Sequence, residues 1–153
     1  MSCVVGLDLS LRSTGCCAID DDSKSVIACC LVNAEKDVYG VQRLAFLINR
    51  ISYFVEKHKP RMVAIEGYAF ASNMAYAREI AELGGIVKLW LHRAHVPFEL
   101  VAPTKLKKFA TGKGNAKKNQ MLLAVYKKWG VEFSNDNEAD AYALARFAAE
   151  PLT

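Results

Sequence analysis

The sequence has no run of apolar residues that approaches the roughly 18 needed to cross a membrane. Its first dozen residues contain Asp8, where a secretory signal peptide would be apolar. With 52% hydrophobic and 24% charged residues among 153, the composition is that of a folded chain and argues against intrinsic disorder. We therefore expect a single domain over residues 1–153, with a cytoplasmic location.

The cysteines also lack the spacing found in zinc-binding and redox motifs. The chain has five of them, an odd number, and none stands in the CxxC pattern of zinc or redox motifs: Cys3, Cys16, Cys17, Cys29 and Cys30. All five fall in predicted strands. We expect them to be small buried residues and assign them no chemistry.

One basic segment contrasts with the rest of the chain. Residues 105–118 contain no acidic side chain and six lysines, Lys105, Lys107, Lys108, Lys113, Lys117 and Lys118. The net charge of the whole chain is only +4, so the remainder is mildly acidic. This asymmetry indicates either a polyanion bound at one place or a solvated lysine face.

The hydrophobic pattern predicts an α/β fold with a mixed five-stranded sheet flanked by helices. Three closely spaced strands come first and can only form an antiparallel meander. The strands are expected at 3–9, 15–20, 25–33, 62–67 and 98–103. Helices are expected at 41–59, 73–94, 105–109 and 135–150. A further helix is expected to follow the TGKGN loop and to end at Gly130. The helical crossovers between later strands favour a layered α/β architecture.

Three acidic residues stand where a simple fold does not need them. Asp8 lies in an apolar strand, Glu66 ends another strand, and Asp140 lies on the alanine-rich last helix. Each has an ordinary interpretation, as a turn residue, a solvent-facing strand end or a surface carboxylate. Acids at the ends of neighbouring strands and on a covering helix can also converge.

Convergent carboxylates without a nearby histidine or thiol favour a hard cation, so Mg²⁺ or Mn²⁺ fits better than zinc. Two such ions about 4 Å apart can activate water and stabilise the leaving oxygen of a phosphodiester. The lysine segment would then provide counter-charge for phosphate. The residues thus predict metal-dependent phosphodiester hydrolysis.

Four motifs, in order, resemble the RuvC family of Holliday junction resolvases, within the ribonuclease H-like superfamily. They are GLDLSLRSTGCCAI, VAIEGYAFASN, APTKLKKFATGKGNAKKNQ and NEADAYALA. The chain looks most like the short members encoded by bacteriophages, which would place it in the host cytoplasm. The resemblance implies a homodimeric, Mg²⁺-dependent endonuclease that cuts four-way junctions and other branched DNA, leaving 5′-phosphate and 3′-hydroxyl ends.

The family's catalytic residues map by position onto Asp8, Glu66, Asp140, Lys107 and Lys118. A fourth acidic position of the family is occupied here by Asn137, and Asp136 lies one turn before Asp140 and is the alternative ligand. The family also has an aromatic residue that inserts at the junction centre. Tyr68 and Phe70 flank the corresponding position, and both can equally be core residues.

Other interpretations stay open at this point. A ribonuclease H-like nuclease of broader specificity would debranch DNA or cut RNA. A branched-DNA-binding module with little catalysis would tolerate the neutral Asn137. The first motif also resembles the phosphate loop of actin-like ATPases, which need a second domain that 153 residues do not readily hold.

Overall fold

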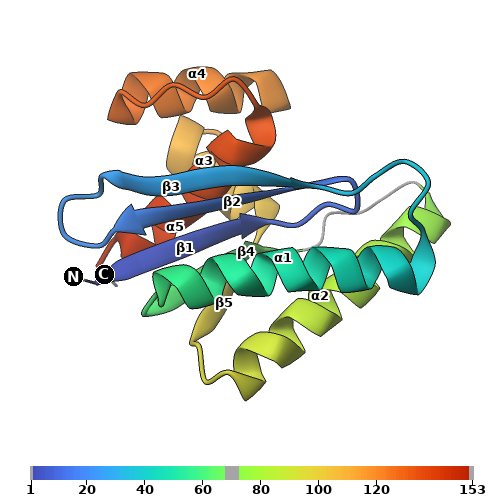
Figure 1. The fold of residues 1–153 in the computed structure, drawn as a ribbon. Helices are drawn as coiled ribbons and strands as arrows, with labels where there is room; N and C mark the ends of the chain where they lie inside the picture. Colours follow the sequence, from blue (N-terminus) through green and yellow to red (C-terminus); the bar gives the residue numbers. More distant parts are fainter. Residues whose placement is uncertain (1, 68–72, 152–153) are drawn as a thin grey trace.

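A mixed five-stranded sheet forms the centre of the molecule, with strand order β3-β2-β1-β4-β5. The computed structural model describes residues 2–67 and 73–151. The first three strands are antiparallel, whereas β4 runs parallel to β1 and β5 parallel to β4 (Figure 1). The strands are β1 (Cys3–Asp8), β2 (Ser13–Asp20), β3 (Val26–Asn33), β4 (Met62–Glu66) and β5 (Phe98–Val101). The predicted fold class is confirmed.

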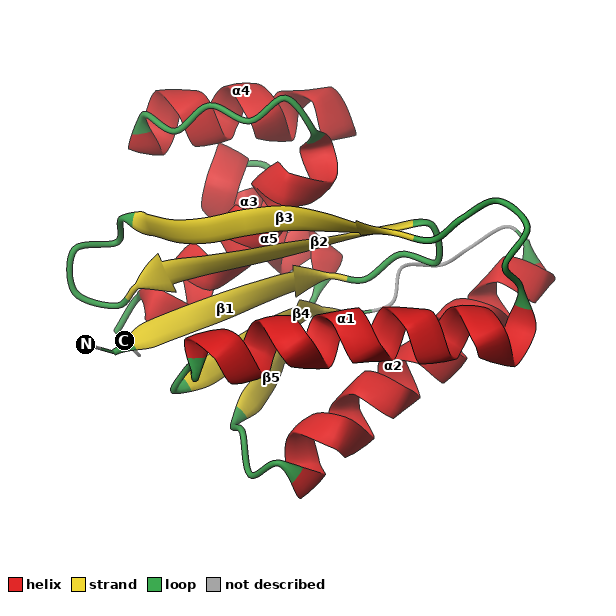
Figure 2. Ribbon diagram, viewed as in Figure 1, coloured by secondary structure: helices red, strands yellow, loops and turns green. Residues whose placement is uncertain are grey.

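Helices cover both faces of this sheet (Figure 2). One face packs against α1 (Gly40–His58) and α2 (Met74–Arg93). The other packs against α3 (Pro103–Thr111), α4 (Lys118–Trp129) and α5 (Asp136–Ala149). Because β1 is buried on both faces, it reads as a continuous apolar run. No helix among the described residues is long and apolar enough to span a membrane.

Residues at the helix ends explain where three of the helices begin or stop. Gly130 ends α4 with a φ of 70°, a left-handed conformation that glycine adopts without steric cost. Asn135 caps α5 by accepting a hydrogen bond from the backbone N–H of Asn137 at 2.7 Å. Helix α3 is longer than predicted. It begins at Pro103, where a missing N–H costs nothing, and ends before Gly112.

The alanine-rich helix α5 lies directly on the sheet. A Cβ atom placed on Gly6 of β1 would be 1.9 Å from the carbonyl oxygen of Ala141. No side chain other than hydrogen fits there, so the helix backbone approaches the strand more closely than usual. The small residues of α5 are therefore part of the packing that fixes its height above β1.

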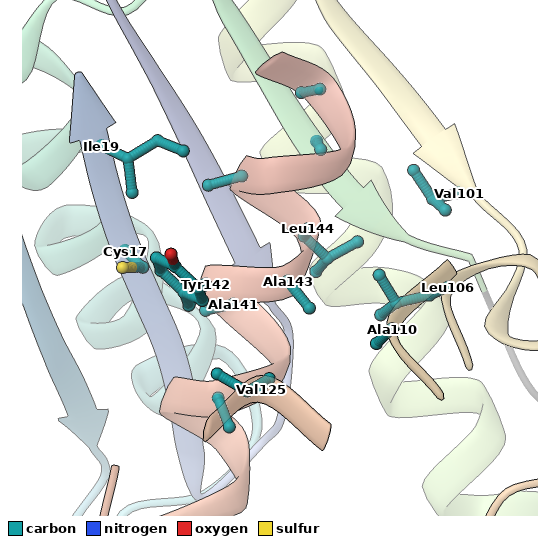
Figure 3. Close-up of a cluster of buried hydrophobic side chains, with 14 of the residues drawn as sticks. Cys17, Ile19, Val101, Leu106, Ala110, Val125, Ala141, Tyr142, Ala143 and Leu144 are labelled. Carbon is teal, nitrogen blue, oxygen red and sulfur yellow. The ribbon is translucent and has the colours of Figure 1, made fainter. Parts of the chain in front are cut away.

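Aromatic contacts hold α3 and α4 against α5. Phe109 of α3 packs against Trp129 of α4 and Phe147 of α5, with ring centroids 5.5 and 5.3 Å apart. Trp129 in turn meets the buried Tyr142 edge-on at 5.7 Å. Figure 3 shows Tyr142 of α5 among buried hydrophobic side chains that include Cys17 of β2 and Leu106 of α3. The lysine-bearing helices are thereby fixed relative to α5.

The cysteines are partly at variance with the expectation that they carry no chemistry. Cys17 and Cys29 face each other across β2 and β3 and form a disulfide. Cys16 and Cys30 are the adjacent cross-strand pair and remain thiols. A hydrogen bond from the Cys16 thiol lowers the pKa of Cys30 to about 7, although partial burial opposes this shift. The same bond, together with burial, raises the pKa of Cys16.

Candidate metal centre

Two of the three predicted carboxylates lie at the same edge of the sheet because their strands are parallel neighbours. Asp8 is the last residue of β1 and Glu66 is the last residue of β4. The register pairs Leu7 with Ile65, so the strands finish side by side. Residues that leave adjacent parallel strands at their carboxyl ends converge at one edge.

Helix α5 brings the third carboxylate, Asp140, to this edge. Its close packing on Gly6 fixes the helix above β1. One oxygen each of Asp8, Glu66 and Asp140 can be chosen so that all three lie within 4.8 Å of one another. All three residues are half-buried. Three carboxylates this close repel one another, and a cation between them would offset that repulsion.

The donor set fits a hard divalent cation. Mg²⁺ and Mn²⁺ prefer oxygen ligands, and all three converging groups supply carboxylate oxygen. The cavity around them, of about 310 Å³, has no histidine or cysteine among its lining residues in the described parts of the chain. The local chemistry therefore suits magnesium or manganese better than zinc.

Asn137 lines the cavity together with the three carboxylates. It lies one helical turn before Asp140, at a spacing that puts both residues on one face of α5. Asp136 is not among the lining residues. Of the two candidates for a fourth ligand, the structure therefore brings the amide, not the carboxylate, to the cavity.

Lys107 of α3 also lines the cavity. Four other predicted lysines, Lys105, Lys108, Lys113 and Lys117, do not line it. Lys105 is exposed and its ammonium lies 5.5 Å from the ring centroid of Phe147. Lys108, Lys113 and Lys117 are exposed. Lys118 begins α4, but its side chain falls outside what the structure describes.

The predicted aromatic wedge residues, Tyr68 and Phe70, lie outside the described residues. Another aromatic residue, Tyr76 in the first part of α2, lines the cavity and is 42% exposed. No motif of the sequence marked Tyr76 as a site residue. Its backbone N–H donates a hydrogen bond to the side chain of the cap residue Asn73 at 3.3 Å, so Tyr76 lies in the first turn of α2.

Sequence reasoning also missed Lys88. This residue of α2 is half-buried and lines the same cavity as the carboxylates. A helical spacing of four connects it to Gly84, Ile80 and Tyr76, which line the cavity too. That spacing was a signal in the sequence, but it could not show which face of α2 would turn toward the sheet edge.

Comparison with known proteins gives one consistent result. The chain matches the family described as "Crossover junction endodeoxyribonuclease RuvC" over residues 4–147. It is 31% identical over 147 residues to the RuvC of Treponema denticola, covering 94% of this chain and 83% of that protein. It is 35% identical over 104 residues to the RuvC of Brachyspira hyodysenteriae, covering 68% and 65%.

The fold agrees with this assignment. A structure titled "T. thermophilus RuvC in complex with Holliday junction substrate" superposes with a TM-score of 0.81 at 21% identity. The superposition covers 95% of this chain and 91% of that one. The resemblance to the short phage-encoded members stays a prediction. With a family match across nearly its whole length, the chain belongs to the RuvC family of crossover junction endodeoxyribonucleases.

Proposed function

We propose that this RuvC-family endonuclease resolves four-way DNA junctions with Asp8, Glu66 and Asp140 as the ligands of its divalent metal. The observation that carries the proposal is the convergence of these three carboxylates to within 4.8 Å at the sheet edge. When bound, two Mg²⁺ ions would activate the attacking water and stabilise the leaving oxygen. Mn²⁺ would be able to replace Mg²⁺, because it prefers the same oxygen ligands.

Residues of the chain would position the metal ions and neutralise the charge of the phosphate. Asp8 lies at the end of the central strand, between the strand that carries Glu66 and the helix that carries Asp140. It is therefore the residue best placed to serve both ions. The Asn137 side-chain oxygen would complete the ligand set without adding charge. Lys107 lines the cavity and would neutralise charge on the scissile phosphate.

The lysine segment would hold the DNA backbone. Lys105, Lys108, Lys113 and Lys117 are exposed on or beside α3 and α4, which are fixed to α5 by the aromatic cluster. A protein that neutralises phosphates with lysines loses affinity steeply as salt rises. Lys118 would join this group, and Tyr68 or Phe70 would stack on an unpaired base at the junction centre.

Resolution of a four-way junction needs two cuts, one in each of two strands of the same junction. One chain has one such carboxylate site among its described residues. Two copies of the chain would supply two sites related by a twofold axis, which is the simplest closed assembly. We infer a homodimer whose two chains each form one nuclease domain. The enzyme would act in the cytoplasm, where its DNA would be.

The test uses a labelled four-way junction, a Y-fork, a linear duplex and an RNA–DNA hybrid, each with Mg²⁺ or with EDTA. The proposal predicts paired cuts near the crossover that disappear in EDTA. Cleavage of the hybrid alone would contradict junction resolution and favour a broader nuclease. Tight junction binding without cleavage in Mg²⁺ or Mn²⁺ would instead leave a DNA-binding module.

A further inference from the structure

A lysine from the opposite layer of the fold enters the metal cavity. Lys88 belongs to α2, which covers the face of the sheet opposite α5 (Figure 1). It nevertheless lines the same cavity as Asp8, Glu66 and Asp140. The carboxylates therefore meet a positive charge on the α2 side and Lys107 on the α3 side.

The residues that precede Lys88 on the same face of α2 also line the cavity. One turn before it, Gly84 lines the cavity without a side chain, and Ile80 continues the same face. Lys88 itself is half-buried. A lysine has a long flexible stem and one concentrated charge, and it can move several ångströms without disturbing its helix.

An ammonium group in this cavity has an electrostatic consequence. It attracts the carboxylates when no metal is bound, because opposite charges attract. It also repels a divalent cation that enters the same cavity. The interaction is strong where water is partly excluded, and weaker where it is screened. The same carboxylates thus attract two alternative cations, one of which is part of the chain.

We propose that Lys88 is the resident counter-ion of the carboxylate cluster and competes with the divalent metal for it. This inference rests on the proposed function, because it takes Asp8, Glu66 and Asp140 as metal ligands. The competition keeps metal affinity low in the free protein. Phosphate groups of bound DNA give the ammonium another partner and remove the competition, so metal binding and DNA binding reinforce each other.

The test is a Mn²⁺ titration of the DNA-free protein, followed by electron paramagnetic resonance of the unbound ion. Lys88→Met removes the charge and keeps most of the length of the side chain. It should bind Mn²⁺ about tenfold more tightly than the wild type. Lys88→Arg keeps the charge and should bind within about threefold of the wild type. Arg93→Met removes an exposed positive charge from the same helix and should also match the wild type.

Equal or weaker Mn²⁺ binding by Lys88→Met would overturn the inference. A second readout is the Mg²⁺ concentration that gives half-maximal single-turnover cleavage, which should stay within about threefold of the wild type in Lys88→Met, because bound DNA has already removed the competition. A lower maximal rate with unchanged Mn²⁺ affinity would also overturn it, because Lys88 would then act on the DNA. Asp8→Asn separates the two claims. If it binds Mn²⁺ like the wild type, the metal site itself is wrong; if it loses Mn²⁺, an unchanged Lys88→Met refutes the Lys88 role alone.

Discussion

Gly15 of β2 lies so close to Asn137 of α5 that a Cβ atom on the glycine would be 2.2 Å from the Asn137 carbonyl oxygen. Gly6 makes the equivalent approach to Ala141 one turn later along the helix. These two contacts set the height of α5 above the strands. The position of Asn137 and Asp140 over Asp8 therefore depends on the absence of two side chains from the sheet.

Gly15→Ala should both destabilise the protein and weaken its metal site. The added methyl group meets backbone atoms, which cannot rotate away, so α5 must shift. We expect a loss of about 1–3 kcal/mol of unfolding free energy, measured by urea denaturation. The matched control is Gly85→Ala in α2, where an added Cβ meets nothing within 4 Å. Alanine favours a helix, so the control should gain up to about 1 kcal/mol.

If Gly15→Ala unfolds at the same urea concentration as Gly85→Ala, the sheet can accommodate a methyl group beneath α5. That result would contradict the prediction. The Mn²⁺ affinity of Gly15→Ala gives an independent check. A destabilised variant whose folded state binds Mn²⁺ like the wild type would show that the helix can move without carrying Asn137 and Asp140 out of place.

Asn137→Asp should strengthen metal binding. The change adds a negative charge at the cavity wall and leaves side-chain size almost unchanged. We expect Mn²⁺ affinity to rise about tenfold in the DNA-free protein. Asp136→Asn is the matched control, because Asp136 does not line the cavity, and it should bind Mn²⁺ nearly as well as the wild type. A large loss in Asp136→Asn would identify Asp136 as the ligand instead.

Junction binding should become less sensitive to salt when exposed lysines of the basic segment are removed. The double variant Lys108→Ala, Lys113→Ala should lower the slope of log affinity against log salt by about 2, if each lysine contacts one phosphate. Junction affinity would be measured at several salt concentrations by fluorescence anisotropy, with Ca²⁺ in place of Mg²⁺. The control pair is Lys36→Ala, Lys57→Ala, two exposed lysines elsewhere on the surface. Equal slopes in both pairs would make residues 105–118 an ordinary solvated face.

Cys30 should be the most reactive free thiol at neutral pH. The thiolate is the nucleophile, and the hydrogen bond from Cys16 lowers the pKa of Cys30 to about 7. Its rate of alkylation by iodoacetamide should therefore rise with pH and reach half its maximum near pH 7. Cys3 is a matched comparison, because burial raises its pKa and it should react only at higher pH. Peptide mass spectrometry resolves the two sites. A Cys30 profile centred near that of an ordinary thiol would contradict the hydrogen bond.

Much of the fold could be predicted because each element has a local cause. Apolar runs such as residues 62–66 mark buried strands, and Gly130 and Asn135 mark helix ends. The start of α3 at Pro103 was missed because a proline usually ends regular structure, although it is tolerated in a first turn. The Cys17–Cys29 disulfide was missed because it depends on register across β2 and β3.

The candidate site likewise contains some features that the sequence predicts and others that it does not. The convergence of Asp8, Glu66 and Asp140 could be expected, because acids at the ends of neighbouring strands and on a covering helix can meet at one edge of the sheet. Lys88 could not, because the sequence of α2 does not tell which of its faces turns toward the sheet edge. The choice between Asn137 and Asp136 likewise depended on the rotation of α5, which Gly6 and Gly15 fix only in the folded sheet.

The most direct test of the central claim compares Glu66→Gln with the wild type on one four-way junction. Binding is measured in Ca²⁺ and cleavage in Mg²⁺. Glu82→Gln, an exposed position of α2, is the control for loss of one carboxylate. If Asp8, Glu66 and Asp140 hold the catalytic metal, Glu66→Gln should bind the junction as the wild type does and cut it at least about a hundredfold more slowly. Glu82→Gln should cut normally. Wild-type cleavage by Glu66→Gln would contradict the account.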